Sequence, residues 1–313
     1  MVETSFSVDA IKSGKAWISV YGVGYVGLSL IAVLLRKGFR VIGVDINEER
    51  LKLIEEGKLW FNELEIKEAV SRGLEDGRLK LTSDGEGASR EALIKIITVP
   101  VKVDWLGKTF NLRPIEDVGR TIAKGLKVGD LVILESSVPP GTTAFTLRPV
   151  LESHSGLRVE KDFFLAYSPE RVYIGHAVKD IEVNYPKIVG GVGKKSLEAA
   201  AKFYSQIASK GVIKLSSTTA AEFEKLAEGV YRDVNIALAN ELALASMKLG
   251  VDFFEVRKAA NSQPYSHIHL PGPGVGGYCI PLYPYFLAET LLRNGYVMEL
   301  TLLSRRINEG MPY

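Results

Sequence analysis

Residues 17–27 read Trp-Ile-Ser-Val-Tyr-Gly-Val-Gly-Tyr-Val-Gly, an apolar run that passes directly into a G-x-G-x-x-G pattern. A helical pattern of apolar residues follows, so the glycines lie where a buried strand turns into a helix. In that context the first glycine permits the turn, the second lets a pyrophosphate approach the backbone, and the third lets helix and strand pack closely. The pattern predicts a dinucleotide-phosphate loop at the free N–H groups of the helix. The residues of the expected loop are Gly22, Val23, Gly24, Tyr25, Val26 and Gly27. The alternative is that the glycines only serve a tight turn.

Asp45 stands eighteen residues after Gly27, at the end of the next apolar run, Val41–Val44. A carboxylate at this spacing accepts hydrogen bonds from the adenosine ribose and repels a 2′-phosphate. The sequence therefore predicts NAD as the cofactor in preference to NADP.

Apolar runs and helical patterns continue to alternate up to about residue 214. Several of the runs are almost unbroken, as is typical of strands covered on both faces. This βαβ rhythm predicts an α/β, Rossmann-like, doubly wound and mostly parallel sheet over residues 1–216. The expected strands are 17–21, 41–44, 94–98, 131–135, 163–166, 187–189 and 212–214. The expected helices are 26–37, 48–56, 63–72, 115–125 and 196–208.

The pattern changes after Lys214, where no further strand is expected. Thr219 followed by Glu222 indicates a capping box, and it opens an alanine- and leucine-rich helix over about 220–249 that ends at Gly250. Shorter helices are expected at 253–260, 282–292 and 298–308. Residues 217–313 thus read as an all-α central domain.

The long helix is apolar on more sides than a small helical domain can cover. We expect it to form a homodimer interface. Its apolar positions include Phe223, Val230, Val234, Leu238 and Leu242.

Composition excludes several classes of function. The chain has 313 residues and a formal net charge of +2, from 39 basic and 37 acidic residues. This mixture gives no electrostatic footprint for nucleic acid and no polybasic membrane patch. The longest apolar run is too short to span a bilayer, and no secretion signal opens the chain. A single cysteine fits a reducing, cytoplasmic compartment. The four histidines show no metal-ligand spacing, so no metal is expected.

That cysteine, Cys279, follows Pro-Gly-Pro-Gly-Val-Gly-Gly-Tyr, residues 271–278. Glycines and prolines at this density predict a tight loop whose backbone can approach a ligand closely. A lone thiol cannot form an intrachain disulfide. Cys279 is therefore either a core residue or a nucleophile.

Taken together, these motifs resemble the nucleotide-sugar 6-dehydrogenases, the UDP-glucose/GDP-mannose dehydrogenase family. The resemblance covers almost the whole chain, and its last two blocks are closest to the N-acetylhexosamine (UDP-N-acetylmannosamine) branch. The matching blocks are 21–28, 45–47 with Arg50, 135–143, 168–171, 186–191, 224–226 with 231–241, and the Cys279 loop.

The resemblance implies that a UDP-sugar is oxidised at C6 to a carboxylate in two NAD-dependent steps. A cysteine traps the aldehyde as a thiohemiacetal, and water then cleaves the resulting thioester. It implies that Cys279 is the nucleophile, that Lys225 stabilises the alkoxide and that Glu170 orients or activates water. Without the resemblance, Lys225 reads as a solvated lysine and Glu170 as a cap. The implied cofactor site also includes Arg50, Pro100 and Ser137.

Four positions depart from the family pattern. Tyr283 replaces an aspartate, Gly229 an asparagine, Tyr265 an arginine and Tyr278 a histidine. A tyrosine cannot replace the charge of a carboxylate at neutral pH. Family members also continue for roughly another hundred residues, the size of one more domain, which binds the nucleotide. We therefore expect this chain alone to turn over UDP-sugars poorly.

Three interpretations remain open at this stage. The first is a nucleotide-sugar dehydrogenase or its first two domains. The second is a catalytically impaired NAD-binding homologue whose helical domain serves assembly. The third is a 3-hydroxyacid dehydrogenase, a class that has no use for a cysteine on a glycine loop.

Overall fold

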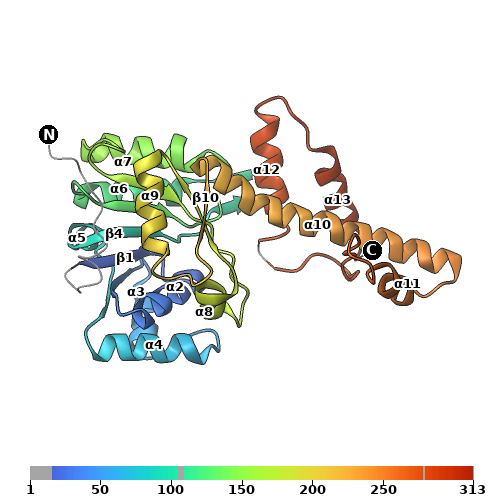
Figure 1. The fold of residues 1–313 in the computed structure, drawn as a ribbon, viewed down its shortest axis with the longest axis horizontal. Coiled ribbons are helices and arrows are strands. Elements are labelled where there is room, and N and C mark those ends of the chain that lie inside the picture. The colour runs from blue at the N-terminus through green and yellow to red at the C-terminus, as the bar shows by residue number, and fades with distance from the viewer. Residues whose placement is uncertain (1–15, 105–108, 278, 313) are drawn as a thin grey trace. The chain divides into compact units, whose positions relative to one another are not determined.

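The computed structural model describes residues 16–104, 109–277 and 279–312. The chain divides into two compact units (Figure 1). The first runs to Val103 and resumes over Asn111–Glu222, and the second consists of Phe223 onward with the short segment between. We describe each unit separately.

An eight-stranded sheet of order β10-β9-β8-β7-β4-β1-β2-β3 forms the first unit. All neighbouring strands are parallel except β8 and β9. The predicted mostly parallel, doubly wound sheet is therefore confirmed. The strands are β1 (Trp17–Tyr21), β2 (Arg40–Val44), β3 (Leu79–Thr82), β4 (Ala92–Ile97), β7 (Leu131–Leu134), β8 (Phe164–Tyr167), β9 (Lys187–Gly191) and β10 (Val212–Leu215). A separate two-stranded sheet pairs β5 (Lys102–Asp104) with β6 (Thr109–Asn111).

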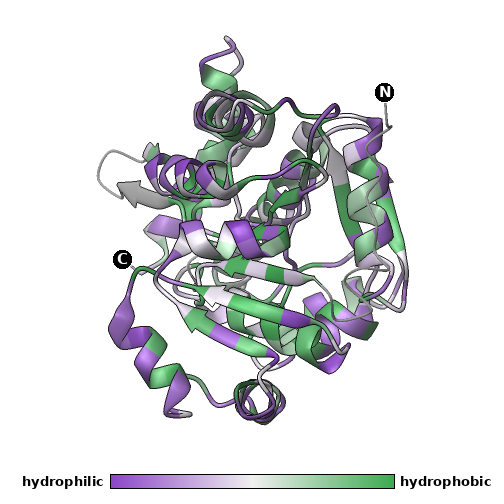
Figure 2. Cartoon of the chain, turned by 90° about the vertical axis from the view of Figure 1, so that its left-hand side faces the viewer, coloured by the Kyte–Doolittle hydropathy of each residue, from purple (hydrophilic) through white to green (hydrophobic). Residues whose placement is uncertain are grey.

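Hydrophobic burial explains why the unbroken apolar runs became central strands. β1 and β7 are fully buried, β4 is buried except at Leu93, and the strands are mostly hydrophobic in Figure 2. The main core cluster joins β1 to α2 and to the more distant helices α4 and α9. The helices are α2 (Tyr25–Arg36), α3 (Glu48–Glu55), α4 (Leu64–Glu75), α5 (Gly85–Glu91), α6 (Arg113–Gly125), α7 (Arg148–Ser155), α8 (Ala177–Lys179) and α9 (Lys194–Tyr204), with two π-helical turns, η1 (Thr143–Leu147) and η2 (Asp180–Asn184).

The second unit is built on helix α10 (Thr218–Leu249). Its other helices are α11 (Phe253–Ala260), α12 (Tyr283–Leu292) and α13 (Glu299–Gly310). The long helical element predicted after the sheet is therefore confirmed. None of the described helices is both long enough and apolar enough to cross a membrane.

The predicted capping box at the start of α10 is wrong. The Oγ of Ser217 accepts from the amide of Ala220 at 3.1 Å, so the cap lies before Thr219. The Glu222 carboxylate instead accepts from residues 141 and 143. The Glu222 side chain therefore makes a tertiary contact in place of the local capping bond.

Helices α10 and α13 are joined by buried polar groups. The Asp233 carboxylate pairs with Arg305 at 2.6 Å, and Asn240 donates to Asn308 at 2.9 Å. Asn308 in turn donates to the Asp233 carbonyl oxygen. Buried polar groups that pair with one another fix the register of two packed helices.

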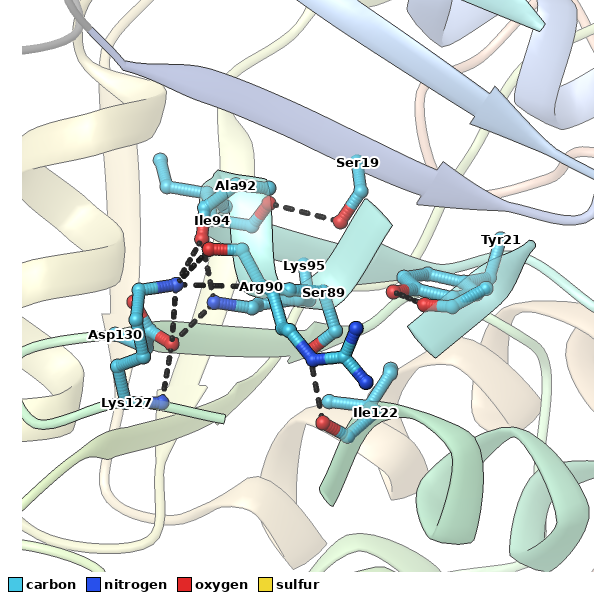
Figure 3. Close-up of polar contacts among 11 residues, drawn as sticks. Ser19, Tyr21, Ser89, Arg90, Ala92, Ile94, Lys95, Ile122, Lys127 and Asp130 are labelled. Carbon is cyan, nitrogen blue, oxygen red and sulfur yellow. Dashed lines mark hydrogen bonds and ion pairs between the residues drawn. The ribbon is translucent and has the colours of Figure 1, made fainter. Parts of the chain in front are cut away.

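A second buried charge pair lies where β4 and β7 begin (Figure 3). The Lys95 ammonium contacts the Asp130 carboxylate and donates to the Ala92 carbonyl oxygen at 2.6 Å. Asp130 also accepts from the Lys127 amide at 2.7 Å. Burial lowers the pKa of Lys95 to about 7, even though the Asp130 charge opposes that shift.

Candidate active site

The glycine loop follows β1 and forms the N-terminus of α2. Gly22 has a φ of 96°, and its amide donates to the Val44 carbonyl oxygen at 2.7 Å. A Cβ at Gly27 would overlap the carbonyl oxygen of Gly22, so the strand-to-helix packing admits only glycine there. These two glycines have the roles predicted for a tight turn and close packing.

Gly24 is extended and is the N-cap of α2, with no side-chain cap. A Cβ built on it meets no atom within 4 Å, so the backbone borders open space. Tyr25, Val26 and Gly27 follow in the first turn, where amide groups lack intrahelical partners. An uncapped helix start facing open space fits a bound pyrophosphate. The residues present therefore fit NAD.

Asp45 is 6% exposed and anchors the neighbouring loops. One carboxylate oxygen accepts from the Asn47 amide at 2.9 Å. The other accepts from the Val23 amide at 3.0 Å and from the Arg50 guanidinium at 2.9 Å. The carboxylate thus links the glycine loop to the end of β2, where the resemblance expects the ribose to bind.

Arg50 extends this edge toward an aromatic group. Its guanidinium lies 5.5 Å from the centre of the Trp60 ring, and the Phe61 ring stands edge-on to Tyr25 at 5.0 Å. The Tyr25 hydroxyl contacts the Glu63 carboxylate. Burial and that hydrogen bond raise the pKa of Tyr25, so the phenol stays neutral. Arg50 and Tyr25 therefore contact two different aromatic residues, Trp60 and Phe61, whose rings stand edge-on to each other at 5.5 Å.

The two predicted nicotinamide-side residues follow neighbouring strands. Pro100 is exposed after β4, and Ser137 is half-buried after β7. The hydroxyl of Ser136 donates to the Val99 carbonyl oxygen at 2.6 Å and holds the two loops together. The strand order reverses between β1 and β4, so the loop after β4 borders the switch point where ligands bind in such folds, and the loop after β7 lies next to it at the same carboxyl edge.

Glu222 fastens the loop after β7 from the start of α10. Its carboxylate accepts from the Gly141 amide at 2.5 Å, the Thr143 amide at 2.8 Å and the Thr143 hydroxyl at 2.6 Å. Burial raises the pKa of Glu222 to about 7, although these hydrogen bonds oppose the shift.

Glu170 lies in the loop after β8. One carboxylate oxygen accepts from the Lys187 ammonium at 2.6 Å, and the other accepts from the Arg171 amide at 2.7 Å. The Lys187 ammonium also lies 3.3 Å from the Glu135 carboxylate. Glu170 is therefore one member of a buried charge cluster and not a helix cap.

The second unit holds the cysteine and the lysine. Cys279 is exposed, and its carbonyl oxygen accepts from the amides of Leu282 and Tyr283 at 3.0 Å each. The ammonium of Lys225 lies 5.8 Å from the centre of the Tyr283 ring. The structure thus brings Cys279, Tyr283 and Lys225 together around the start of α12.

Two of the departures from the family pattern are in contact. A Cβ built on Gly229 would overlap the ring of Tyr283 and would lie 3.2 Å from the Cβ of Tyr283. The buried tyrosine therefore occupies the space that a side chain at position 229 would need. Tyr265 is 92% exposed, and Tyr278 lies outside the described residues.

The segment before the cysteine loop is fixed to α10 and α11. The Asn235 side chain donates to the His267 carbonyl oxygen and accepts from the His269 amide. Asn261 makes the same pair of bonds with Ile268. The side-chain amides of Asn235 and Asn261 thus bond to backbone groups that have no regular secondary structure, and they hold this segment in place.

Comparison with known proteins now decides the family. The profile of the NAD-binding domain of the UDP-glucose/GDP-mannose dehydrogenase family matches residues 16–208, and that of its central domain matches residues 219–310. The chain belongs to the UDP-glucose/GDP-mannose dehydrogenase family. The resemblance seen in the sequence is thereby confirmed.

Individual members of the family show the same relationship. The UDP-N-acetyl-D-mannosamine dehydrogenase of Pyrococcus horikoshii is 39% identical over 94% of this chain, which spans 68% of that relative. The corresponding enzyme of Methanococcus aeolicus is 36% identical over 94% of the chain, which spans 64% of it. The solved Pyrococcus horikoshii structure has a TM-score of 0.88 at 38% identity, over 95% of this chain and 69% of that one.

Sequence reasoning assigned no role to three residues of the candidate site. Glu135 and Lys187 lie inside family blocks, yet neither has a local signal of contact with Glu170. Glu222 did have a signal, the capping box, but it indicated the wrong partner. Lys187 was the one usable signal, because a lysine in a predicted buried strand needs a partner of opposite charge.

Proposed function

We propose that this chain provides the NAD-binding and catalytic portion of a nucleotide-sugar 6-dehydrogenase acting on a UDP-N-acetylhexosamine such as UDP-N-acetylmannosamine. The observation that carries the proposal is the arrangement in the second unit, where Tyr283 bonds through its amide to the carbonyl oxygen of the exposed Cys279 and faces the half-buried Lys225 with its ring. The names of the relatives support the substrate class.

The cofactor loop would hold NAD through the first turn of α2, Asp45 and Arg50. Asp45 would accept from the ribose hydroxyls, and Pro100 and Ser137 would border the nicotinamide. NAD, when bound, supplies the hydride acceptor for alcohol and aldehyde oxidation.

Cys279 would act as the nucleophile. Its thiolate adds to the aldehyde carbon at C6 and forms a carbon–sulfur bond, while Lys225 stabilises the negative oxygen. After oxidation to the thioester, a water molecule attacks the same carbon and gives a proton to Glu170. The carbon–sulfur bond then breaks, which releases the carboxylate and regenerates the thiolate.

A second candidate is a catalytically impaired NAD-binding homologue. The observation in its favour is that Tyr283 fills the space beside Gly229, where the family pattern has two polar side chains. A tyrosine there supplies no negative charge to assist Lys225 in proton handling. The same feature predicts slow turnover under the leading proposal.

The proposal is tested by measuring cofactor binding and product formation separately. Calorimetry should show tighter binding of NAD than NADP, and D45A should weaken NAD binding while the surface control D76A should not. With UDP-N-acetylmannosamine, mass spectrometry should detect the uronate, formed slowly, with two NADH per sugar. C279A should abolish this product and K225M should slow it, whereas K248M, elsewhere on α10, should do neither.

The outcomes separate the candidates. Equal or tighter NADP binding would contradict the assignment of Asp45. Undiminished product from C279A would rule out the nucleophile. NAD binding with no product from the parent chain would favour the impaired homologue.

A further inference from the structure

Lys187 is the centre of a buried charge cluster at the carboxyl edge of the first unit. Its side chain is 5% exposed, and those of Glu135 and Glu170 are 0% and 8% exposed. The ammonium lies 2.6 Å from Glu170 and 3.3 Å from Glu135, and 5.0 Å from the centre of the Tyr204 ring. The Tyr204 hydroxyl contacts the same Glu135 oxygen as Lys187.

The reversed direction of β9 creates this cluster. β8 and β9 are antiparallel, with Ala166 opposite Gly191 and Tyr167 opposite Gly190. Continuing that register by three residues brings Glu170 opposite Lys187, and the Ser168 hydroxyl bonds to Ile188 on the way. In a parallel strand, the first residue would lie at the other edge of the sheet. The antiparallel pair therefore delivers a cation to the edge where Glu170 lies.

The charges of the cluster do not balance when both carboxylates are ionised. Two carboxylates and one ammonium leave one net negative charge away from water, which is costly. The second oxygen of Glu135 is buried and has no hydrogen-bond partner among the described residues. An unpartnered oxygen costs less on a neutral carboxyl group than on a carboxylate. Glu135 is the better site for a proton, because both oxygens of Glu170 accept hydrogen bonds.

Electrostatics support the same assignment. Burial raises the pKa of Glu135, and the Glu170 charge adds to that effect while Lys187 opposes it. Burial alone would lower the pKa of Lys187, but the negative charge of the carboxyl pair outweighs it and raises the pKa, so the ammonium stays charged. Burial also raises the pKa of Tyr204. Tyr185 feels the charges of both Glu170 and Arg171. The Arg171 guanidinium lies over the Tyr185 ring and donates to the Pro186 carbonyl oxygen, and only the Arg171 backbone amide bonds to Glu170.

We propose that Lys187 is a positioning residue that keeps the Glu170 carboxylate ionised and oriented, while Glu135 holds one proton that makes the cluster neutral. This proposal rests on the proposed role of Glu170 in accepting a proton from water. Glu170 would then be ready to act as a base, because the proton that the cluster requires resides on its neighbour. Arg171 fixes the second oxygen, so the carboxylate has one orientation.

The test is a carbon-13 NMR titration of the full chain labelled at its glutamate carboxyl carbons. E170Q and E135Q each remove one signal and so assign both groups. K187M should raise the midpoint of the Glu170 titration by about one pH unit or more, and K187R should restore it. The matched control is K214M, because Lys214 pairs with Glu198 at the same 2.6 Å but at the surface. K214M should leave the Glu170 midpoint unchanged.

E135Q gives an independent test if K187M does not fold. A neutral Glu135 predicts that E135Q leaves the Glu170 midpoint unchanged, whereas an ionised Glu135 predicts that it falls. A fall in E135Q, or an unchanged midpoint in folded K187M, would overturn the proposal. The titration does not require turnover. An inactive chain would therefore contradict the proposed function, whereas the titration would still decide the role of Lys187.

Discussion

At the scale of single residues, Glu222 connects the first turns of α10 to the loop that carries the expected nicotinamide-side residues. It accepts two amide hydrogen bonds and one hydroxyl hydrogen bond, and its side chain is fully buried. Three donors are unusual for a carboxyl group whose pKa is nevertheless raised. Burial outweighs them, which makes this contact sensitive to pH near neutrality.

The first residue-scale prediction concerns stability. With a native pKa of about 7 against an ordinary value of 4.5, Glu222 binds more protons in the native state than in the unfolded state. Its contribution is therefore complete below about pH 4.5 and is lost as the pH rises through about 7, an effect of the order of 3 kcal/mol. Denaturant unfolding across this range should show a decline that E222Q reduces. The exposed control E241Q should keep the decline, and equal slopes in parent and E222Q would contradict the prediction.

At the scale of elements, α10 and α12 meet at Gly229 and Tyr283. Glycine in the middle of a helix costs about 1 kcal/mol relative to alanine, so its presence needs a reason. The reason is the tyrosine ring, which a Cβ at position 229 would overlap. The Tyr283 amide also bonds to the Cys279 carbonyl oxygen, so a displaced ring would disturb the cysteine loop.

A double-mutant cycle tests this pairing. G229A should destabilise the parent chain because it forces the ring to move. In a Y283A background the same substitution should stabilise by about 0.5–1 kcal/mol, because helix propensity then acts alone. G310A, at a helical glycine with nothing within 4 Å, should not destabilise in either background. Equal effects of G229A in both backgrounds, measured by denaturant unfolding, would refute the pairing.

The elements also show what a sequence can predict. β1 and β7 were predictable because strands buried on both faces are unbroken apolar runs. β3 was not, because Leu79–Thr82 lies at the sheet edge and is only partly buried. The Glu170–Lys187 contact depends on one reversed strand, and strand direction has no local signature. The partner of Glu222 was missed because a cap motif and a tertiary contact use the same side chain.

At the scale of the whole molecule, α10 leaves apolar side chains uncovered in the single chain. Phe223 and Leu238 are each 47% exposed and Leu242 is 37% exposed, while Val230 and Val234 are half-buried. Its buried side carries Asp233, Ala237 and Asn240. This division supports the proposal that α10 pairs with a second copy of the chain.

Sedimentation tests the assembly. The chain should sediment as a dimer at micromolar concentration, and the double substitution L238E/L242E should shift it to a monomer by placing charges in the interface. V128E, at an exposed apolar residue of the first unit, should remain dimeric. A parent chain that sediments as a clean monomer would refute the proposed dimer.

The Lys95–Asp130 pair has a consequence for how the sheet can be observed. Lys95 is completely buried, and its lowered pKa is itself a product of that burial, so no reagent reaches its amine while β4 and β7 stay paired. Amine-specific acylation would therefore mark Lys95 only in molecules where β4 and β7 have separated. The rate at which Lys95 is labelled, compared with the fast labelling of surface lysines, would therefore report how often this part of the sheet opens.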